Sequence, residues 1–428
     1  MRKINKWLLL LLSFCLIFLI SCENNCKEKQ NNENKVTLTV WASEEDQAMI
    51  KAMCNEFSKA NPDKQYNFLF GIEGEGDVAD KVLNDVTSGP DVYSFASDQI
   101  NKLYAGGALA RVGGENETKI KQINTSGSID AATIKINNED MIYAYPSTGD
   151  NCYFLYYDKS IYKNESDIAT LESILEIAKQ NNKKFHFRLN DDGWYLSSFF
   201  FAEESLNYHV TYNNSLVEEK VTINYDTDKG LEVMKALRNY LNIESMVAQT
   251  DDSKIIAGFT SDANGKRSIA ACVSGTWNAL TIKGLLKDNF GVAKLPTVTI
   301  DNEEKQLSGF MGYKLIGVNG YSKNKADAHK LAMWLTNEQN QLKRYQVRGF
   351  IPTNKNVLEN DTIKNDPVAK AVINQSQYNR VQKGVPSNYW TPMGSLITPI
   401  ITAIDEGKTV TDKELLELLV ATCNSIRK

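Results

Sequence analysis

Trp277 stands where an α/β protein could bind a ligand. The stretch 268–273 before it is a continuous run of apolar and small residues, which is typical of a strand buried on both faces. Gly275 ends that strand, and a helix-compatible segment follows the tryptophan. Ligands of open α/β sheets bind just beyond the carboxyl ends of the strands, so this indole is a candidate for ligand contact. Packing in the core is the alternative role for the side chain.

Two more aromatic side chains occupy the same kind of position. The segment 36–41 alternates and is rich in β-branched residues, which predicts a strand ending at Trp41. A Gly-Pro-Asp turn at 89–91 leads into a strand ending near Phe95. Asp98 follows at the start of a helix, where its carboxylate could bind a ligand or cap the helix. Trp194 also stands at the start of a helix, which it could simply anchor.

Acidic residues follow the first predicted strand. Ser43 is a suitable N-cap, and a helix with an apolar face follows until an Asn-Pro pair at 61–62 ends it. Glu44, Glu45 and Asp46 lie in its first turn. Their carboxylates either bind a ligand or only stabilise the positive end of the helix.

The elements that must position these residues form an α/β pattern. In the first part of the chain we predict strands over 36–41, 65–70 and 90–95, with helices between them. Strand, helix and strand in this order build a parallel α/β lobe with right-handed connections. A second set follows, with predicted helices over 170–180, 196–204 and 231–241 and strands over 185–189 and 268–273. About four hundred residues suit two such lobes.

Composition excludes several classes of function. The formal charge is −5, and removing the three cations near the N-terminus changes it to −8. An acidic chain without a basic stripe argues against binding of nucleic acid. The chain has three His, none near a Cys, so we expect no metal site and no cofactor. Outside the leader and Cys22, an odd number of cysteines excludes a fully paired disulfide framework.

The N-terminus predicts export and a lipid anchor. Three cations precede an apolar run over 7–20, the pattern of a secretory signal over 1–21 rather than of a spanning helix. Leu-Ile-Ser-Cys at 19–22 resembles the bacterial lipobox, which implies cleavage before Cys22 and acylation of its thiol. The alternative is an ordinary thiol after an ordinary signal. Residues 22–35 are mostly polar and predict a flexible tether, so the domain would sit on the extracytoplasmic face of the cell membrane.

The order of several motifs resembles the extracellular solute-binding proteins of ABC sugar importers, most of all the maltose and maltodextrin group. The resemblance covers nearly the whole mature chain. It rests on Trp41, Gly-Pro-Asp-Val at 89–92, Gly-Gly-Ala-Leu at 106–109, Tyr-Tyr-Asp-Lys at 156–159, Ser-Gly-Thr-Trp at 274–277, Phe-Gly-Val-Ala-Lys-Leu-Pro at 290–296, Gly-Val-Asn at 317–319 and Ile-Pro-Thr-Asn at 351–354.

This resemblance implies a two-lobed α/β fold of the periplasmic-binding-protein type II, each lobe built on a mixed, mainly parallel sheet. Residues 36–147 and 292–346 would form the first lobe, and 148–291 and 347–428 the second. The chain would cross near 146–152, 289–292 and 347–351. Closure of the lobes would capture an oligosaccharide for delivery to the permease subunits of an importer, and we expect a monomer.

Sugar chemistry explains the residue types of such a cleft. Aromatic planes cover the C–H faces of a pyranose, while carboxylates and amides bind its rim of hydroxyls. Candidate aromatic contacts are Trp41, Phe95, Trp194, Trp277 and Trp390. Candidate rim contacts are Glu44, Glu45, Asp46, Asp98, Gln99, Asn151 and Asn278. Met393 and Trp390 could also belong to the core.

Departures from the family pattern leave the identity of the sugar open. Phe95 stands where the maltose group carries Trp, and Gln99 stands where it carries Arg. Asn151 falls near a family Glu, and no Arg accompanies Trp390. Losing the Arg and the Glu removes two charged contacts to hydroxyls.

Other functions compete with sugar binding. A carbohydrate-active enzyme could use paired acids such as Glu203 and Glu204. The sequence shows no Gly-x-Ser-x-Gly motif, however, and its scattered His residues suggest no triad. A surface adhesin would not need ordered aromatic residues in a cleft. Within binding proteins, a peptide, polyamine or metal ligand is the main alternative.

Overall fold

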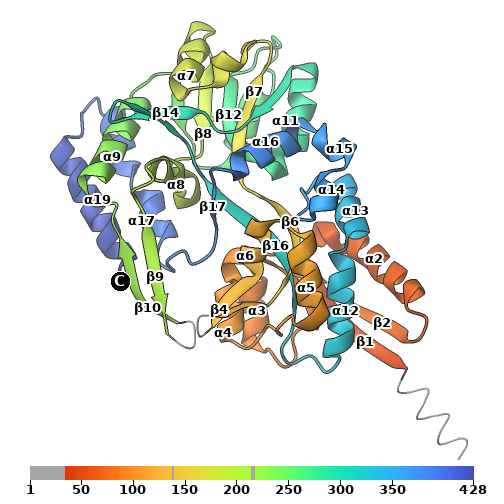
Figure 1. Ribbon diagram of the computed structural model, residues 1–428. Coiled ribbons are helices and arrows are strands. Elements are labelled where there is room, and N and C mark those ends of the chain that lie inside the picture. Colours follow the sequence, from red (N-terminus) through yellow and green to blue (C-terminus); the bar gives the residue numbers. More distant parts are fainter. Residues whose placement is uncertain (1–33, 137–138, 214–216) are drawn as a thin grey trace, which may run out of the picture.

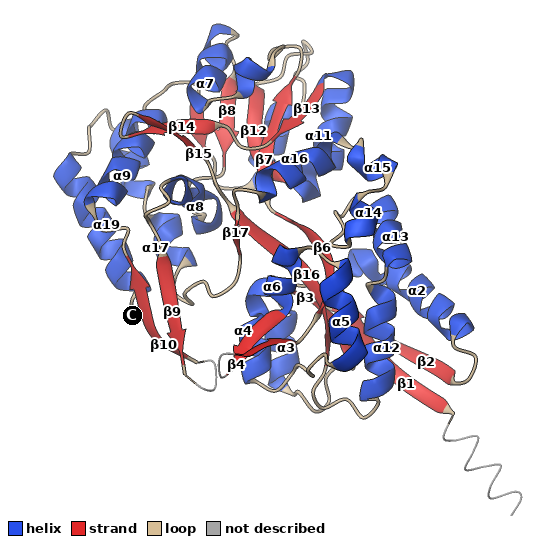
Figure 2. Cartoon of the chain, in the orientation of Figure 1, coloured by secondary structure: helices blue, strands red, loops and turns tan. Residues whose placement is uncertain are grey.

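The computed structural model describes residues 34–136, 139–213 and 217–428, which fold into two α/β lobes (Figure 1). The predicted signal peptide, Cys22 and nearly all of the tether lie outside the described residues. Among the residues described, no helix is long and apolar enough to cross a membrane. Figure 2 shows one sheet in each lobe, with helices packed around it.

The first lobe is built on a six-stranded sheet of order β17-β16-β3-β1-β2, with β6 also paired to β16. The alternation seen in the sequence is the cause of β1, because Val36, Leu38, Val40 and Ala42 all point to the core. Strands β1, β2 and β3 are parallel, whereas β16 runs antiparallel to β3. The strands are β1 (Lys35–Ala42), β2 (Gln65–Ile72), β3 (Val92–Ala96), β6 (Tyr145–Asn151), β16 (Phe310–Val318) and β17 (Arg380–Val381).

The second lobe is built on a five-stranded sheet of order β11-β8-β12-β7-β13. Its central strand β12 is buried along its whole length, as the apolar run predicted. It pairs parallel with β8 and antiparallel with β7, so the sheet is mixed. The strands are β7 (Tyr153–Asp158), β8 (Lys184–Phe187), β11 (Met246–Ala248), β12 (Ile269–Gly275) and β13 (Phe290–Ala293).

Helices and hairpins complete both lobes. Around the first sheet lie α2 (Gln47–Ala60), α3 (Val78–Asn84), α4 (Ile100–Ala105), α5 (Gly114–Ile123), α6 (Ser126–Ala132), α12 (Lys325–Leu335), α13 (Glu338–Arg348), α14 (Lys355–Leu358), α15 (Asp361–Lys364) and the hairpin of β4 (Thr133–Ile136) and β5 (Glu139–Ile142). Around the second lie α7 (Leu171–Gln180), α8 (Gly193–Ala202), α9 (Asp228–Leu241), α10 (Asp252–Phe259), α11 (Ala279–Leu286), α16 (Pro367–Ser376), α17 (Trp390–Ser395), α18 (Thr398–Asp405), α19 (Asp412–Ile426) and the hairpins β9 (Tyr208–Tyr212) with β10 (Glu218–Ile223) and β14 (Thr297–Ile300) with β15 (Glu303–Gln306). Short 3₁₀ helices are η1 (Glu44–Asp46), η2 (Ser97–Gln99), η3 (Glu165–Ile168), η4 (Thr276–Asn278) and η5 (Lys287–Asn289).

Two of the three crossings lie later in the chain than we expected. The chain first passes from one sheet to the other between β6 and β7. Strand β13 still belongs to the second sheet, and the β14–β15 hairpin packs beside α7 and α9, so the return to the first lobe comes only at β16. Likewise α14 packs on α13, and the chain reaches the second lobe only with α16, which packs on β13. The apolar side chains of these two segments are buried in different clusters: Leu295, Val298 and Leu307 in a second-lobe core, and Ile351, Val357 and Ile363 in a cluster that extends through both lobes.

The described residues contain free cysteines and no cluster of metal-binding side chains. Cys54, Cys152, Cys272 and Cys423 are free and buried. Burial raises the pKa of the Cys54 thiol to about 12, so that thiol stays protonated at neutral pH. No group of His, Cys, Asp or Glu side chains in the described ranges could hold a metal ion.

Candidate functional site

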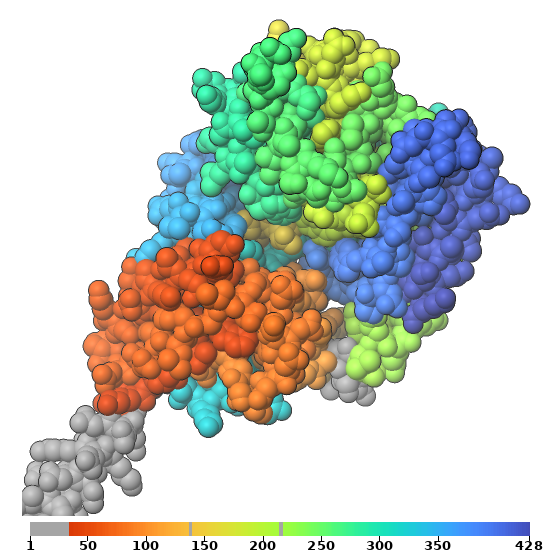
Figure 3. All heavy atoms as spheres, turned by 180° about the vertical axis from the view of Figure 1, so that it is seen from behind, coloured from red at the N-terminus to blue at the C-terminus, as the bar shows by residue number. Residues whose placement is uncertain are grey.

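A cavity of about 360 Å³ lies between the two lobes. Figure 3 shows from behind how the red and orange surface of the first lobe meets the green and blue surface of the second. The cavity is lined by Asp98, Asn151, Arg188, Asp192, Trp194, Tyr195, Trp277, Gln382 and Trp390. Five of these, Asp98, Asn151, Trp194, Trp277 and Trp390, are residues that we predicted. We call it the inner compartment.

Two tryptophans form the aromatic wall of the inner compartment. The ring centroids of Trp194 and Trp277 are 5.9 Å apart, with 38° between the planes. Each indole N–H has a partner: Trp194 donates to Gln382 Oε1 at 2.9 Å, and Trp277 donates to Asp252 Oδ2 at 2.8 Å. Gly275 lies under the Trp277 ring, where any Cβ atom would come within 2.2 Å of it. The backbone thus supports one face of this indole, and 44% of the side chain is exposed.

The start of α8 positions much of this wall. Asp192 accepts hydrogen bonds from the backbone N–H groups of Trp194 at 2.9 Å and Tyr195 at 3.3 Å, so it caps the helix. A side chain at Gly193 would collide with the Trp390 carbonyl oxygen, and this close approach brings α17 against α8. Arg188 Nε lies 3.1 Å from Asp192 Oδ2. The Asp-Gly-Trp-Tyr sequence at 192–195 is typical of a helix start with an N-cap, but nothing in it indicates that Arg188 pairs with Asp192.

Polar groups face the tryptophans. The Asp98 side chain is exposed to the cleft; partial desolvation by the surrounding lobes raises its pKa, and the neighbouring Gln382 amide opposes that shift. Burial likewise raises the pKa of Asp192, against the Arg188 charge. The Tyr195 hydroxyl is buried, and it finds no hydrogen-bond partner in the described part of the chain. A buried hydroxyl without a partner costs free energy, which a ligand hydroxyl would recover.

Several predicted ligand contacts are core residues instead. Phe95 has no exposed surface and packs 5.8 Å from Tyr93, centroid to centroid. Met393 is fully buried in the second-lobe core. Asp46 is 1% exposed, and its carboxylate lies 2.7 Å from Arg344 Nη1 and 3.0 Å from Arg348 Nε. A strand end places a side chain at the rim of a sheet, but the packing of neighbouring helices decides whether it is covered.

Other predicted contacts lie outside the inner compartment. Trp41 is half-buried with its ring over Gly71 of the neighbouring strand. The Gln99 side chain binds the loop before α3, where its Nε2 donates to the Glu75 carbonyl at 3.0 Å. Glu44 and Glu45 are exposed in η1 and do not line the cavity. Asn278 is buried and donates to Ser274 Oγ at 2.8 Å.

A buried carboxyl sits at the crossing next to the cavity. Asp150 accepts a hydrogen bond from Ile351 N at 3.2 Å, and its backbone oxygen accepts one from Thr276 Oγ1 at 2.9 Å. Burial raises its pKa to about 6, although Lys314 and Arg344 oppose the shift. Asp150 therefore links the crossing strand, the segment after α13 and the turn that carries Trp277.

Comparison with known proteins decides the family. The model of the bacterial extracellular solute-binding proteins matches residues 52–371. The chain belongs to this family. It is 26% identical over 335 residues to the galactooligosaccharide-binding protein of Bacillus subtilis (strain 168), covering 76% of this chain and 75% of that protein. It is 24% identical over 360 residues to the maltotriose-binding protein of Pyrococcus abyssi (strain GE5 / Orsay), covering 84% and 74%.

A solved structure confirms the fold of this solute-binding protein. A structure described as being with acarbose superimposes with a TM-score of 0.76 at 30% identity. The match covers 92% of this chain and 99% of that one. The two-lobed α/β architecture expected from the sequence is therefore confirmed.

Proposed function

We propose that this solute-binding protein captures an oligosaccharide in the cleft between its lobes and delivers it to an ABC importer. The observation that carries the proposal is the Trp194–Trp277 wall, which shares its cavity with Asp98 and Tyr195. Aromatic planes and hydroxyl-binding groups are what a pyranose requires. The relatives are named for galactooligosaccharide and maltotriose, which supports the same class of ligand here.

A polyamine is the alternative ligand that the charges of the site must be weighed against. A polyamine could use Asp98 and the aromatic rings. Arg188, however, places a guanidinium in the same cavity, 5.9 Å from the centre of the Tyr195 ring. Intrinsic tryptophan fluorescence, titrated with maltodextrins, galactooligosaccharides, spermidine and short peptides, tests the choice. We expect only the sugars to change the emission; a response to spermidine or peptides alone would refute sugar capture.

We propose binding without catalysis. The relatives are named as binding proteins, which supports this role. Of the acids that an enzyme could have used, Glu203 pairs with Lys305 Nζ at 2.7 Å and does not line the cavity. Thin-layer chromatography of oligosaccharide after long incubation should show no shortening; products from the purified protein would contradict us.

We propose that closure of the lobes accompanies binding. Three crossings join the lobes, so short hinges can absorb the backbone change. A ligand drives closure only by binding the closed state more tightly. Small-angle scattering should give a smaller radius of gyration with saturating oligosaccharide, and an unchanged radius would count against closure.

We propose that a lipid on Cys22 holds the protein at the extracytoplasmic face of the cell membrane. The basis is the lipobox-like stretch 19–22 after an apolar run. Cys22→Ala should give a folded protein that leaves the membrane fraction. A variant that still sediments quantitatively with membranes would show that another element anchors it.

A further inference from the structure

Gln382 lies between the two walls of the inner compartment, and its backbone is held to the first lobe. The residue follows β17, the short strand that pairs with the beginning of β16. Its backbone nitrogen donates to the Met311 carbonyl oxygen at 2.9 Å, and its carbonyl oxygen accepts from Ser97 Oγ at 3.5 Å. Ser97 belongs to η2 of the first lobe, and Gln382 is buried.

The amide at the end of this side chain meets groups from both lobes. Its Oε1 atom accepts the hydrogen bond from the indole N–H of Trp194, which belongs to α8 of the second lobe. An indole nitrogen can only donate, so the amide must present its oxygen to Trp194. The amide NH2 group is left for an acceptor, and it faces the Asp98 carboxylate. Desolvation raises the pKa of Asp98, and the hydrogen-bonding Gln382 amide lowers it.

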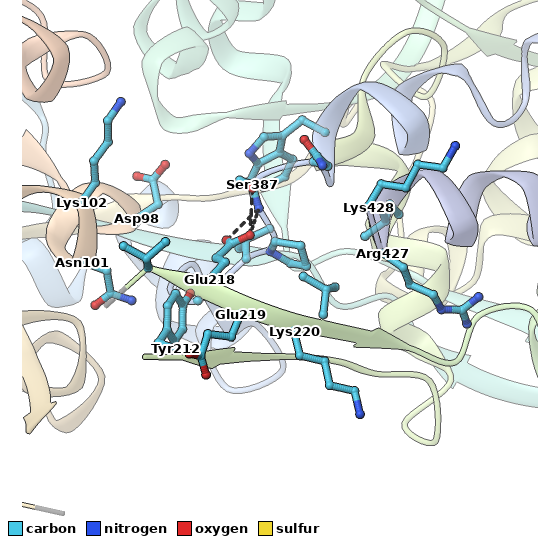
Figure 4. Close-up of a pocket in the computed structure, with 18 of the residues that line it drawn as sticks. Asp98, Asn101, Lys102, Tyr212, Glu218, Glu219, Lys220, Ser387, Arg427 and Lys428 are labelled. Carbon is cyan, nitrogen blue, oxygen red and sulfur yellow. Dashed lines mark hydrogen bonds between the residues drawn. The ribbon is translucent and has the colours of Figure 1, made fainter. Parts of the chain in front are cut away.

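Other polar side chains around Asp98 are bound elsewhere. Figure 4 shows Asp98 on the first-lobe side of a neighbouring cavity, with Lys102 beside it and Ser387 across from it. Lys102 pairs with Asp80, and the Ser387 hydroxyl donates to Glu218 at 2.8 Å. Of these side chains, the glutamine is the one whose donor is left for the Asp98 carboxylate.

The cations nearest to Gln382 are also paired. Arg188, which lines the same cavity, lies 3.1 Å from Asp192 Oδ2. Lys383 is the next residue in the chain, and its Nζ lies 3.4 Å from Asp130 Oδ1. A negative charge introduced at position 382 would therefore meet a carboxylate that neither of these cations neutralises.

We propose that Gln382 is a positioning residue of the sugar site, which holds the Asp98 carboxylate of one lobe and the Trp194 indole of the other at a fixed spacing across the cleft. The inference rests on the proposed function and deepens it, because it names the residue that joins the two walls. A sugar would meet both groups at once, the carboxylate at a hydroxyl and the indole at a C–H face. Groups that are fixed before binding lose less freedom when the ligand arrives, so fixing them raises the affinity.

A double-mutant cycle tests whether Gln382 acts through Trp194. Gln382→Leu removes both hydrogen-bonding functions at similar size, and calorimetric titration should show an oligosaccharide affinity about fivefold lower. Trp194→Phe keeps an aromatic plane without the N–H donor, and it should cost less affinity in the Gln382→Leu background than in the wild type. An equal cost in both backgrounds would overturn the inference.

Gln382→Glu tests the bridge to Asp98 through a pH profile. The variant keeps an acceptor for Trp194 but places a second carboxyl beside Asp98. At pH 7.5 the two carboxylates repel each other, so the variant should bind at least about fivefold more weakly than the wild type. At pH 4.5 the pair should hold a proton and form a hydrogen bond, which should bring the affinity within about twofold of the wild type at that pH. A ratio of the two affinities that does not change with pH would contradict the proposed role.

Gln180→Leu is the matched control, because this exposed glutamine on α7 bonds to Glu176 and lies outside the cavity. Its affinity should equal that of the wild type. Thermal melting of every variant monitors the fold, and the pH ratio of Gln382→Glu remains decisive if Gln382→Leu melts too early to titrate. If the wild type binds oligosaccharide and the Gln382 variants bind it equally well, only this inference fails. If the wild type binds no oligosaccharide, the proposed function itself fails.

Discussion

Trp277→Ala tests whether Trp277 binds the ligand or only stabilises the fold. The side chain is 44% exposed, so of the roughly 250 Å² that a tryptophan can bury, about 110 Å² is open to a ligand. A sugar face covering about 80 Å² of it would contribute about 2 kcal/mol at ~25 cal/mol per Å². Affinity should therefore fall about thirtyfold in the variant.

The stability of the unliganded Trp277→Ala protein distinguishes a ligand-binding role from a core role. A core tryptophan replaced by alanine costs about 3 to 5 kcal/mol. Here one face of the ring only rests on Gly275, and the substitution removes the hydrogen bond from the indole N–H to Asp252. We expect the unliganded Trp277→Ala protein to be destabilised by about 1 kcal/mol.

Calorimetric titration and thermal melting of the same preparation measure both quantities. Trp277→Phe is the matched control, because it keeps an aromatic plane while it removes the N–H donor and part of the ring area. It should retain most of the affinity. The reasoning is refuted if Trp277→Ala melts as a core variant would, or if its affinity equals that of the wild type.

Buried polar groups give three more testable outcomes. Burial raises the pKa of Asp150 to about 6 from an ordinary value near 3.9, so its contribution to stability is present below about pH 4 and lost as pH rises through 6. Asp150→Asn should therefore raise the melting temperature at pH 7.5 more than at pH 4.5; an equal shift at both would contradict this. Tyr195→Phe removes a hydroxyl that has no partner among the described residues, so it should weaken oligosaccharide binding about fivefold while leaving the unliganded melt unchanged or higher; unchanged affinity would exclude the hydroxyl from the site. Asp46→Ala leaves the buried Arg344 and the half-buried Arg348 without their carboxylate and should cost about 3 kcal/mol in urea unfolding, with little effect on the affinity of the folded protein. A selective loss of affinity would return Asp46 to the ligand site.

The local pattern of the chain predicted most elements of the fold. Alternation over 36–41 and the apolar run before Trp277 became β1 and β12 because each depends on a repeat of neighbouring residues. The crossings were harder to place. Which core accepts Leu295 or Ile351 depends on surfaces contributed by distant segments, and their local sequence does not contain that information.

For the site, the sequence by itself determined that Trp194, Trp277 and Asp98 stand at strand ends or helix starts, and the family resemblance added Asn151 and Trp390; all five line the inner compartment. Only the tertiary structure decided which of these positions stay open. Phe95 lies near the end of a strand just as Trp41 does, yet the packing around Phe95 leaves none of its surface exposed. The Trp277 ring rests on Gly275 and stays 44% exposed. Gln382 joins the site across a long sequence separation, because its position follows from the packing of strands, helices and lobes against one another, whereas Arg188 lies four residues before Asp192 and pairs with it locally.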